Sequence, residues 1–397
     1  MAGYNEAECD RHAHSGGRVG PTSRRRLLFV INDADFFISH RLPLAVAARN
    51  VGYDVHIAAA NGPGGARLEQ EGFTFHPIPL TRSGSHPWQE VRTVLALYRL
   101  FRRLRPDLVH TVTVKAVIYG GIAARFARVR ALVSAIPGLG YVFTQSGFLS
   151  AVRRMAVRIA YRLALRHPRG RVIFQNPDDL RVFSDAALIR ADVSVLIKGA
   201  GVDLAAFHPI PEPAGIPLVI LASRMLWAKG IEEFVSAAAL LRSEGVVARF
   251  ALVGSSDPGN PTAVPEQQLR GWQESGVVEW WGRRDDMPTA FAQAHVVCLP
   301  TTYGEGVPKV LIEAAACGRS IIATDVPGCR EIVRHEVNGL LVPAHNIQAL
   351  AQAMKRLIQD APLRQRFGAH GRAIAEADFG VDKVVAKTIE VYRELFA

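Results

Sequence analysis

The sequence predicts an α/β protein made of two doubly wound domains, each built around a parallel sheet. Short apolar runs rich in β-branched residues alternate with segments of helical length, which is typical of βαβ units. The runs lack an apolar–polar alternation, as expected for strands that are buried on both faces. A chain of 397 residues is long enough for two such domains.

The expected strands form two sets. In the first half they are residues 27–31, 55–59, 74–78, 108–112, 131–135, 172–175 and 195–197, and in the second half 218–222, 250–253, 277–281, 296–299, 320–323 and 340–342. Helices are expected between them, among others at 42–51, 88–104, 231–242, 308–317 and 381–396. Sheets of this kind bind ligands at the carboxyl ends of their strands, so we expect the functional site in a cleft between the domains.

A proline-rich stretch, residues 207–217, interrupts the alternation because proline continues neither a helix nor a central strand. We therefore expect an N-terminal domain at 24–209 and a C-terminal domain at 210–380. Residues 1–23 are expected to form a flexible tail, and a final helix at 381–397 to pack back on the N-terminal domain.

Charge is distributed unevenly along the chain. Residues 1–210 hold 28 Lys and Arg against 15 Asp and Glu, whereas the remainder is nearly neutral within a total of +11. A basic half indicates an anionic partner, such as nucleic acid, a membrane surface or a phosphorylated substrate. No secretory signal or transmembrane helix is expected. The four cysteines match neither a zinc pattern nor a disulfide framework and are expected to be reduced thiols of a cytosolic protein.

The segment 302–318, TYGEGVPKVLIEAAACG, is the most informative motif. It follows an expected strand, and glycines on both sides of Glu305 permit close approach of the backbone to a ligand. Pro308 can open a helix and Gly318 can end it, so free N–H groups at the positive helix end would suit a diphosphate. The carboxylates of Glu305 and Glu313 could accept hydrogen bonds from a sugar and a ribose. The alternative for Glu313 is a solvated or N-terminal-turn helix residue favoured by the dipole.

The segment 223–230, SRMLWAKG, lies between an expected strand and the next helix. Arg224 and Lys229 therefore lie on a strand-to-helix loop, where phosphates bind in such sheets. A guanidinium holds phosphate oxygens in a fork and an ammonium acts as a point charge, so together they could stabilise a departing nucleoside diphosphate. The alternative is a pair of solvated loop cations.

These two motifs together resemble the signature of family-4 retaining glycosyltransferases of the GT-B fold. That signature has an Arg and a Lys around a short loop, followed by Glu-x7-Glu and a helix of small residues that ends in Gly. The matching residues in this sequence are Arg224, Lys229, Glu305 and Glu313. The likeness continues through residues 199–209, 282–287 and 325–339 and spans nearly the whole chain after the tail. It implies two Rossmann-like domains whose sheets face a central cleft, with retention of anomeric configuration and without a metal cofactor.

The resemblance also implies roles. Arg224 and Lys229 would hold the diphosphate, Glu305 would contact the donor sugar, and Glu313 would contact the ribose. Lys115, after an expected strand of the first half, is the remaining candidate catalytic residue and ranks above His110. The backbone of Gly306, Val307 and Pro308 would approach the sugar and phosphates, and the loop with Gly282 and Arg283 would border the nucleobase.

Four further features lie in the first half. Asp33 and Asp35 form a D-x-D sequence, but two carboxylates are too few for a metal site. The pair His40–Arg41 is expected to start a helix, as a family feature or as a helix-end cation pair. Residues 138–140 resemble an acceptor-side loop of members that act on lipid-linked sugars. Gln175–Asn176 resembles the family's interdomain strand end.

Residues 148–171 hold seven arginines and no acid. Arg154, Arg158, Arg162 and Arg166 recur every fourth position, beside an apolar stripe of Val152, Met155, Ile159 and Leu163. A basic amphipathic helix at 153–171 is typical of binding to an anionic membrane surface. A solvated helix face is the alternative.

We therefore expect a retaining glycosyltransferase. It would move a hexose or N-acetylhexosamine from a nucleotide-diphosphate sugar, with UDP as the expected nucleotide, to a lipid-linked saccharide in bacterial surface polysaccharide synthesis. It would lie in the cytoplasm, peripheral on the inner face of the cytoplasmic membrane. A GT-B-fold nucleotide-sugar epimerase and a non-enzymatic polyanion-binding protein are the alternatives. Nucleic acid is not expected as a partner, because no RNA-binding platform or recognition-helix motif occurs.

Overall fold

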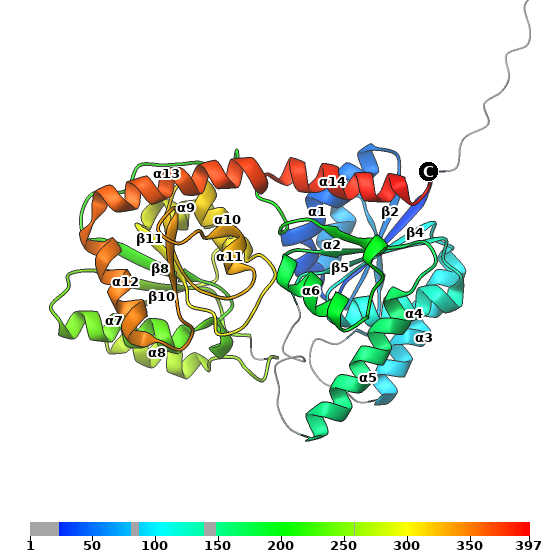
Figure 1. Ribbon diagram of the computed structural model, residues 1–397, viewed down its shortest axis with the longest axis horizontal. Coiled ribbons are helices and arrows are strands. Elements are labelled where there is room, and N and C mark those ends of the chain that lie inside the picture. Colours follow the sequence, from blue (N-terminus) through cyan, green and yellow to red (C-terminus); the bar gives the residue numbers. More distant parts are fainter. Residues whose placement is uncertain (1–23, 81–86, 139–147, 258) are drawn as a thin grey trace, which may run out of the picture.

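Two parallel sheets, one in each half of the chain, form the centre of the structure (Figure 1). The computed structural model describes residues 24–80, 87–138, 148–257 and 259–397, so the expected tail at 1–23 lies outside the described residues. Within the described residues, the N-terminal sheet has seven strands in the order β3-β2-β1-β4-β5-β6-β7. They are β1 (Arg26–Val30), β2 (Asp54–Ala59), β3 (Thr74–Pro77), β4 (Leu108–Val112), β5 (Ala131–Ile136), β6 (Gly170–Phe174) and β7 (Ser194–Leu196).

The C-terminal sheet has six strands in the described part of the chain, in the order β10-β9-β8-β11-β12-β13. They are β8 (Leu218–Ala222), β9 (Arg249–Val253), β10 (Glu279–Gly282), β11 (Val296–Leu299), β12 (Ser320–Thr324) and β13 (Gly339–Val342). All neighbouring pairs in both sheets are parallel. This confirms the predicted α/β class with two Rossmann-like domains.

Helices cover both faces of each sheet, which is why the central strands are buried along their whole length. Around the first sheet lie α1 (Ala34–Asn50), α2 (Pro63–Gln70), α3 (Pro87–Leu104), α4 (Val114–Ala127), α5 (Phe148–Leu165) and α6 (Pro177–Asp185). Around the second lie α7 (Ile231–Ser243), α8 (Glu266–Glu274), α9 (Met287–Gln293), α10 (Lys309–Ala316), α11 (Cys329–Ile332), α12 (Ile347–Gln359) and α13 (Ala361–Asp378). The chain ends with α14 (Val381–Glu394).

The first helix begins earlier than the sequence predicted. The Asp33 carboxylate caps α1 by accepting a hydrogen bond from the N–H of Phe36 at 2.8 Å, and Pro43 lies inside the helix. The expected start near residue 42 is therefore wrong. The pair His40–Arg41 lies inside α1 and not at its start. The cap at Asp33 fixes the first turn, and burial of Phe37, Leu44 and Ala45 in the core offsets the hydrogen bond that Pro43 cannot make.

The C-terminal helix crosses back to the first domain. Figure 1 shows α13 and α14 in succession along one side of both lobes, with α14 over the N-terminal sheet. α14 packs against α1, and its Tyr392 is fully buried in the N-terminal core. The hydroxyl of Tyr392 hydrogen-bonds Nδ1 of His110 on β4.

The proline-rich stretch packs with the second domain. Val202 belongs to the C-terminal core and Phe207 packs against it. The Arg372 side chain of α13 donates hydrogen bonds to the carbonyls of Phe207 and Ala316, at 2.7 and 2.8 Å. We therefore propose that the domain boundary lies ahead of Val202 and not within residues 207–217.

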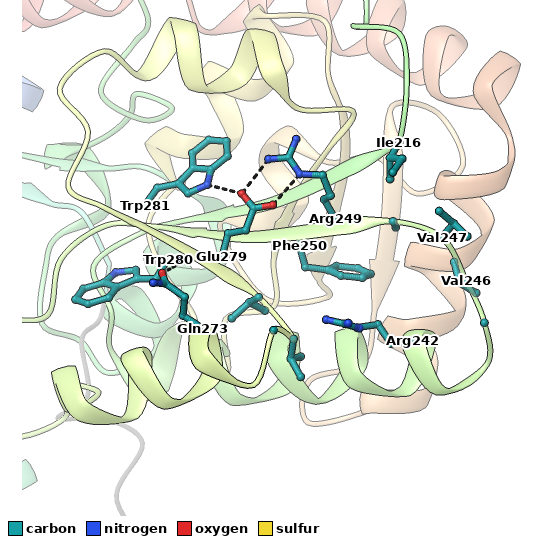
Figure 2. A pocket seen from close by; sticks show the side chains of 15 residues that line it. Ile216, Arg242, Val246, Val247, Arg249, Phe250, Gln273, Glu279, Trp280 and Trp281 are labelled. Atoms are coloured by element: carbon teal, nitrogen blue, oxygen red, sulfur yellow. Dashed lines mark hydrogen bonds and ion pairs between the residues drawn. The ribbon is translucent and has the colours of Figure 1, made fainter.

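A cavity of about 590 Å³ lies at the free edge of the C-terminal sheet, beside β10 (Figure 2). Its polar side chains pair with one another: Glu279 accepts hydrogen bonds from Arg249 at 2.7 and 2.9 Å and from the Trp281 indole at 2.8 Å. The cavity lies at the amino ends of β9 and β10. It is therefore separate from the carboxyl ends of the strands, where doubly wound sheets bind their ligands.

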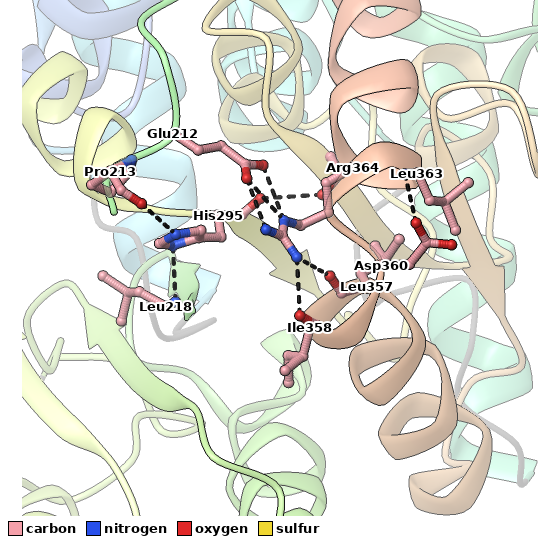
Figure 3. A network of polar contacts seen from close by, with 10 residues as sticks. Glu212, Pro213, Leu218, His295, Leu357, Ile358, Asp360, Leu363 and Arg364 are labelled. Atoms are coloured by element: carbon pink, nitrogen blue, oxygen red, sulfur yellow. Dashed lines mark hydrogen bonds and ion pairs between the residues drawn. The ribbon is translucent and has the colours of Figure 1, made fainter. Parts of the chain in front are cut away.

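A polar network holds the proline-rich stretch onto the second domain (Figure 3). The guanidinium of Arg364, whose side chain is 6% exposed, contacts both carboxylate oxygens of Glu212 and donates to the carbonyls of Leu357 and Ile358. The His295 ring accepts the N–H of Leu218 at 3.0 Å and lies 3.0 Å from the carbonyl of Pro213. These contacts satisfy polar groups that burial would otherwise leave unpaired.

No helix within the described residues combines the length and the apolar character that crossing a bilayer requires. Cys298, Cys317 and Cys329 are free and buried.

Replacing Glu212 with Ala is expected to lower the free energy of unfolding by about 3 kcal/mol, because it leaves the buried Arg364 guanidinium without its carboxylate. Urea denaturation followed by circular dichroism measures this loss. Glu244→Ala is the matched control, because Glu244 forms a half-exposed pair with Lys355 and its loss should cost less than about 1 kcal/mol. Equal losses in the two variants would contradict the role given to the Glu212–Arg364 pair.

Candidate functional site

The loop between β11 and α10 carries Glu305 and enters the space between the two sheets. α10 begins at Lys309, and Pro308 is its N-cap. The sequence predicted Pro308 as the first helical residue, so the helix begins one residue later than expected. Gly318 follows the helix with φ +68°, a conformation that favours glycine. The expected helix after the Glu305 loop is thus present.

Lys229 and Glu305 form a buried ion pair across the carboxyl ends of β8 and β11. Their charged atoms are 2.5 Å apart, and the side chains are only 12% and 15% exposed. Gly230 makes the approach possible, because it has φ +74° and a Cβ there would overlap the carbonyl of Pro300. Burial opposes the charge on Lys229, but Glu305 and then Tyr303 outweigh it, so the pKa of Lys229 is raised.

The other oxygen of the Glu305 carboxylate, Oε1, is buried and has no hydrogen-bond partner within the described residues. A buried acceptor without a donor is costly, and such atoms in native proteins call for a bound group. A hydroxyl of a bound sugar would donate to this oxygen.

Glu313 lies one helical turn after Lys309 and pairs with it on α10. Glu313 is 6% exposed, and burial raises the pKa of its carboxyl while Lys309 lowers it. It is therefore not the solvated helix residue that the sequence left open. Both carboxylates of the Glu-x7-Glu motif thus carry a lysine partner.

A pocket of about 430 Å³ lies between the domains, at the carboxyl ends of β8, β9 and β10. Arg224 and Glu313 line it together with Arg283, and the N-terminal domain contributes Asp33 and Asp35 of α1. The Arg224 guanidinium is half exposed and lies 3.1 Å from Asp257. The pocket therefore brings together one predicted group each for diphosphate, ribose and nucleobase, namely Arg224, Glu313 and Arg283. The other residues predicted to bind the donor are not among the described residues that line it: Lys229, Gly282, Glu305, Gly306, Val307 and Pro308.

His40 also lies near these cations, a placement that the sequence did not predict. Its ring stacks on Phe36 with centroids 4.0 Å apart. Burial, and then the nearby positive charges of Lys309, Arg41 and Arg224, lower the pKa of His40 to about 3, against the opposing hydrogen bond to the Phe36 carbonyl. His40 is therefore neutral and faces the lysine and arginine of the other domain. The only signal in the sequence was the His40–Arg41 pair.

Lys115 and His110 lie elsewhere in the N-terminal domain. Lys115, at the start of α4, pairs with Glu90 of α3 at 3.1 Å. His110 is fully enclosed on β4, where burial and Arg41 hold its pKa well below the ordinary value. Among the described residues, neither lines the pocket with Arg224. Gly138 is described, whereas the rest of the expected acceptor-side loop, 139–140, lies outside the described residues.

Gln175 and Asn176 reach the Glu305 loop from the end of β6. Gln175 Oε1 accepts the N–H of Val307 at 3.0 Å, and Asn176 Nδ2 donates to the Glu305 carbonyl at 3.3 Å. The sequence indicated an interdomain strand end here but no contact with the loop. Asn176 in turn contacts Asp179 of α6, whose pKa is raised by burial to about 6 against the opposing hydrogen bond from Asn176.

Two family models match the chain, one on each sheet. The model described as "Glycosyl transferase 4-like" matches residues 26–176, and the model described as "Glycosyl transferases group 1" matches residues 216–360. The chain belongs to the group 1, family-4-like glycosyltransferases. It is therefore an enzyme, as the sequence predicted.

Named relatives of this glycosyltransferase include two bacterial enzymes. The N,N'-diacetylbacillosaminyl-diphospho-undecaprenol alpha-1,3-N-acetylgalactosaminyltransferase of Campylobacter jejuni is 26% identical over 83% of this chain and 90% of the relative. The UDP-Gal:alpha-D-GlcNAc-diphosphoundecaprenol alpha-1,3-galactosyltransferase of Escherichia coli is 24% identical over 69% of this chain and 72% of the relative.

Solved structures share the fold of this glycosyltransferase. HepE of Anabaena, in complex with UDP and glucose, superposes with a TM-score of 0.76 at 23% identity over 94% of this chain and all of HepE. WaaG, a glycosyltransferase involved in lipopolysaccharide biosynthesis, superposes with a TM-score of 0.71 at 15% identity over 92% of this chain and 99% of WaaG. These likenesses confirm the GT-B fold.

Replacing Asp179 with Asn should stabilise the protein increasingly as the pH rises. The pKa of Asp179 in the folded protein, about 6, lies above that of an aspartate in the unfolded chain, so the folded state binds more protons in this range and wild-type stability falls as the pH rises towards 6. Asn keeps an acceptor for Asn176 and does not ionise. The stability advantage of Asp179→Asn should therefore grow by about 1 kcal/mol between pH 5 and pH 8.

Urea denaturation across this pH range measures the advantage. Asp178→Asn, which removes the neighbouring and more exposed carboxylate, controls for the change in net charge. An advantage that stays constant with pH would refute the assignment of the buried proton to Asp179.

Proposed function

We propose that this glycosyltransferase transfers a hexose or N-acetylhexosamine from a UDP-sugar to a lipid-linked saccharide, with retention of anomeric configuration. The observation that carries the proposal is the largely buried Lys229–Glu305 pair near the interdomain pocket, in which one carboxylate oxygen has no donor among the residues that the structure describes. A sugar hydroxyl would satisfy that oxygen, while a diphosphate would lie between Lys229 and Arg224.

The relatives support the choice of substrates. The names of the Campylobacter jejuni and Escherichia coli enzymes give diphosphoundecaprenol-linked sugars as acceptors, and the second name gives UDP-Gal as donor. HepE holds UDP and glucose in a structure of the same fold. A UDP-sugar and a lipid-linked acceptor are therefore the substrates that we assign to this chain, within bacterial surface polysaccharide synthesis.

The residues of the pocket divide the work of donor binding. Arg224 and Lys229 would bind the diphosphate and stabilise its negative charge as the bond to the sugar breaks. Glu305 would orient the sugar, Glu313 would accept a hydrogen bond from the ribose, and the loop with Arg283 would border the base. Because two side-chain cations supply the charge, we propose that turnover needs no metal.

The acceptor side would belong to the N-terminal domain. α1 presents Asp33, Asp35 and the neutral His40 towards the donor pocket, so these groups would meet the incoming acceptor hydroxyl. Lys115 pairs with Glu90 within its own domain, which supports a place on the acceptor side and not at the donor phosphates.

α5 is the element that we propose to dock on an anionic membrane surface, from the cytoplasmic side. Figure 1 shows it projecting from the N-terminal lobe, where it packs against α4. Met155, Ile159 and Leu163 follow one another at helical spacing and are 57%, 51% and 51% exposed. Arginines at 158, 162 and 166 flank this apolar stripe. Exposed apolar side chains beside cations are the composition of an interfacial helix.

Glu305→Ala and Lys229→Ala should each lower kcat/KM by about 10²- to 10³-fold, because each removes a group that acts on the donor during transfer. Release of UDP from a panel of UDP-, GDP- and ADP-sugars, with and without EDTA, measures turnover. We expect activity with UDP-sugars alone and no loss with EDTA. Glu336→Ala, in an exposed pair with Arg356, is the control and should retain full activity. Wild-type rates in the two folded site variants would refute the site assignment.

Replacing Met155, Ile159 and Leu163 together with Ser should weaken binding to vesicles of anionic phospholipid by at least 10-fold, because it removes the exposed apolar stripe of α5. Vesicle sedimentation measures the binding. The same change at Ile216, Val247 and Val337, three exposed apolar residues of the C-terminal domain, is the matched control. Equal vesicle binding by both triple variants would reject α5 as the docking element.

A further inference from the structure

The loop that carries Glu305 is held by side chains of the opposite domain. Gln175 Oε1 accepts the N–H of Val307 at 3.0 Å, and Asn176 Nδ2 donates to the carbonyl of Glu305 at 3.3 Å. Gln175 and Asn176 are 5% and 0% exposed. These two hydrogen bonds join the end of β6 to the residues on both sides of Gly306.

Gly306 is enclosed by both domains. A Cβ at this position would overlap Gln175 Oε1 and the carbonyl of Pro137 in the N-terminal domain. From the C-terminal domain, a Cβ at Gly328 would overlap the carbonyl of Gly306. The backbone of the loop therefore lies between the domains with no room for a side chain, and its position depends on both.

Asn176 is itself held in place by Asp179 of α6. Its Oδ1 accepts the N–H of Asp179 at 2.8 Å as the N-cap of α6, and its Nδ2 also donates to the Asp179 carboxylate at 2.9 Å. The amide that holds the Glu305 carbonyl thus has one orientation. Asn176 is therefore preorganised, which is the condition for precise placement of a functional residue.

The placement of Glu305 matters because its two carboxylate oxygens have different surroundings. One lies 2.5 Å from Lys229, and Oε1 is buried without a donor among the described residues. A misplacement of about 1 Å at a group that orients the substrate costs up to about 10²-fold in rate. The hydrogen bond to Gln175 also uses the Val307 N–H, which the sequence had assigned to the donor phosphates.

We propose that Gln175 is a positioning residue for sugar transfer: from the N-terminal domain it fixes the Glu305 loop, and Asn176 supports it. This inference rests on the proposed function, because the loop is taken to hold the donor sugar. The nucleotide subsite around Arg224 lies outside this contact, so loss of Gln175 affects the sugar and not the nucleotide. Sugar binding is thereby coupled to the position of the two domains relative to each other.

Gln175→Met tests the proposal, since methionine has a similar length and lacks the acceptor. We expect kcat with the UDP-sugar to fall at least 10-fold, while the Kd of UDP alone, measured by calorimetry, stays within 2-fold of wild type. Gln175→Glu keeps an acceptor oxygen for the Val307 N–H and should recover at least part of kcat. Gln273→Met is the matched control, because Gln273 likewise accepts a backbone N–H, that of Trp280 at 3.0 Å, away from the loop.

Asn176→Ser is the second variant. Ser caps a helix through its hydroxyl but lacks the amide that donates to the Glu305 carbonyl, so α6 keeps a cap while the loop loses a donor and no second carboxylate is placed beside Asp179. It should show the same division between kcat and UDP binding. Unchanged kcat in Gln175→Met and Asn176→Ser would overturn the proposal. Tighter UDP-sugar binding by Gln175→Met would also overturn the proposal, because it would mean that the donor has to displace the Gln175 side chain in order to bind.

Hydrogen exchange separates this inference from the proposed function. Amide exchange in residues 303–308 should speed up at least 5-fold in Gln175→Met relative to wild type and Gln273→Met, with no change in β8. Unchanged exchange would overturn the positioning role. A wild-type protein that neither binds UDP nor transfers sugar would instead refute the proposed donor, and the exchange result would still decide whether Gln175 holds the loop.

Discussion

The approach of the backbone at Gly306 to Gln175, Pro137 and Gly328 constrains the whole site. Because no side chain fits between these segments, the two sheets must stand at one separation for the loop to occupy its place. The Lys229–Glu305 pair and α10 lie within the C-terminal domain, so the contact at Gly306 determines where the N-terminal domain stands relative to them. A functional group set by backbone approach on two sides is held more rigidly than one set by side-chain packing alone.

Charge in the site is balanced before any donor arrives. Arg224 lies against Asp257, Lys229 against Glu305, and Lys309 pairs with Glu313. Buried cations without such partners would be costly, so the carboxylates stabilise the empty pocket. A diphosphate offers the same cations a second set of oxygens, and the half-exposed Arg224 can change partners at little cost because water still reaches it. The more deeply buried Lys229 and Glu305 would remain together and act as one unit.

The chain connects its domains through two crossings that hydrogen-bond to each other. The N–H of Val202 donates to the Phe379 carbonyl, and the N–H of Val381 donates to the Val202 carbonyl, both at 2.9 Å. After Val202, the proline-rich stretch is held on the C-terminal domain by Arg364 and His295. After Val381, helix α14 is held on the N-terminal domain by Tyr392. A change in the angle between the domains must therefore be absorbed at these crossings, close to the Glu305 loop.

The sequence by itself determined the described strands to within about two residues. The central strands are buried on both faces, which imposes continuous apolar runs, whereas the edge strands β3, β7 and β10 are only partly buried and were located by the alternation of strands and helices. It also located the Arg224, Lys229 and Glu305 loops, because each directly follows a strand whose carboxyl end must face the cleft. Local pattern failed at α1, where burial of Phe37, Leu44 and Ala45 in the domain core keeps the helix continuous through Pro43.

Only the tertiary structure decided the contacts between segments far apart in the chain. It paired Lys115 with Glu90, enclosed His110 under Tyr392, and brought Gln175 to Val307, 132 positions away. The physical reason is that a strand or a cap depends on neighbours within a few residues, whereas these contacts depend on how two sheets and their helices are packed.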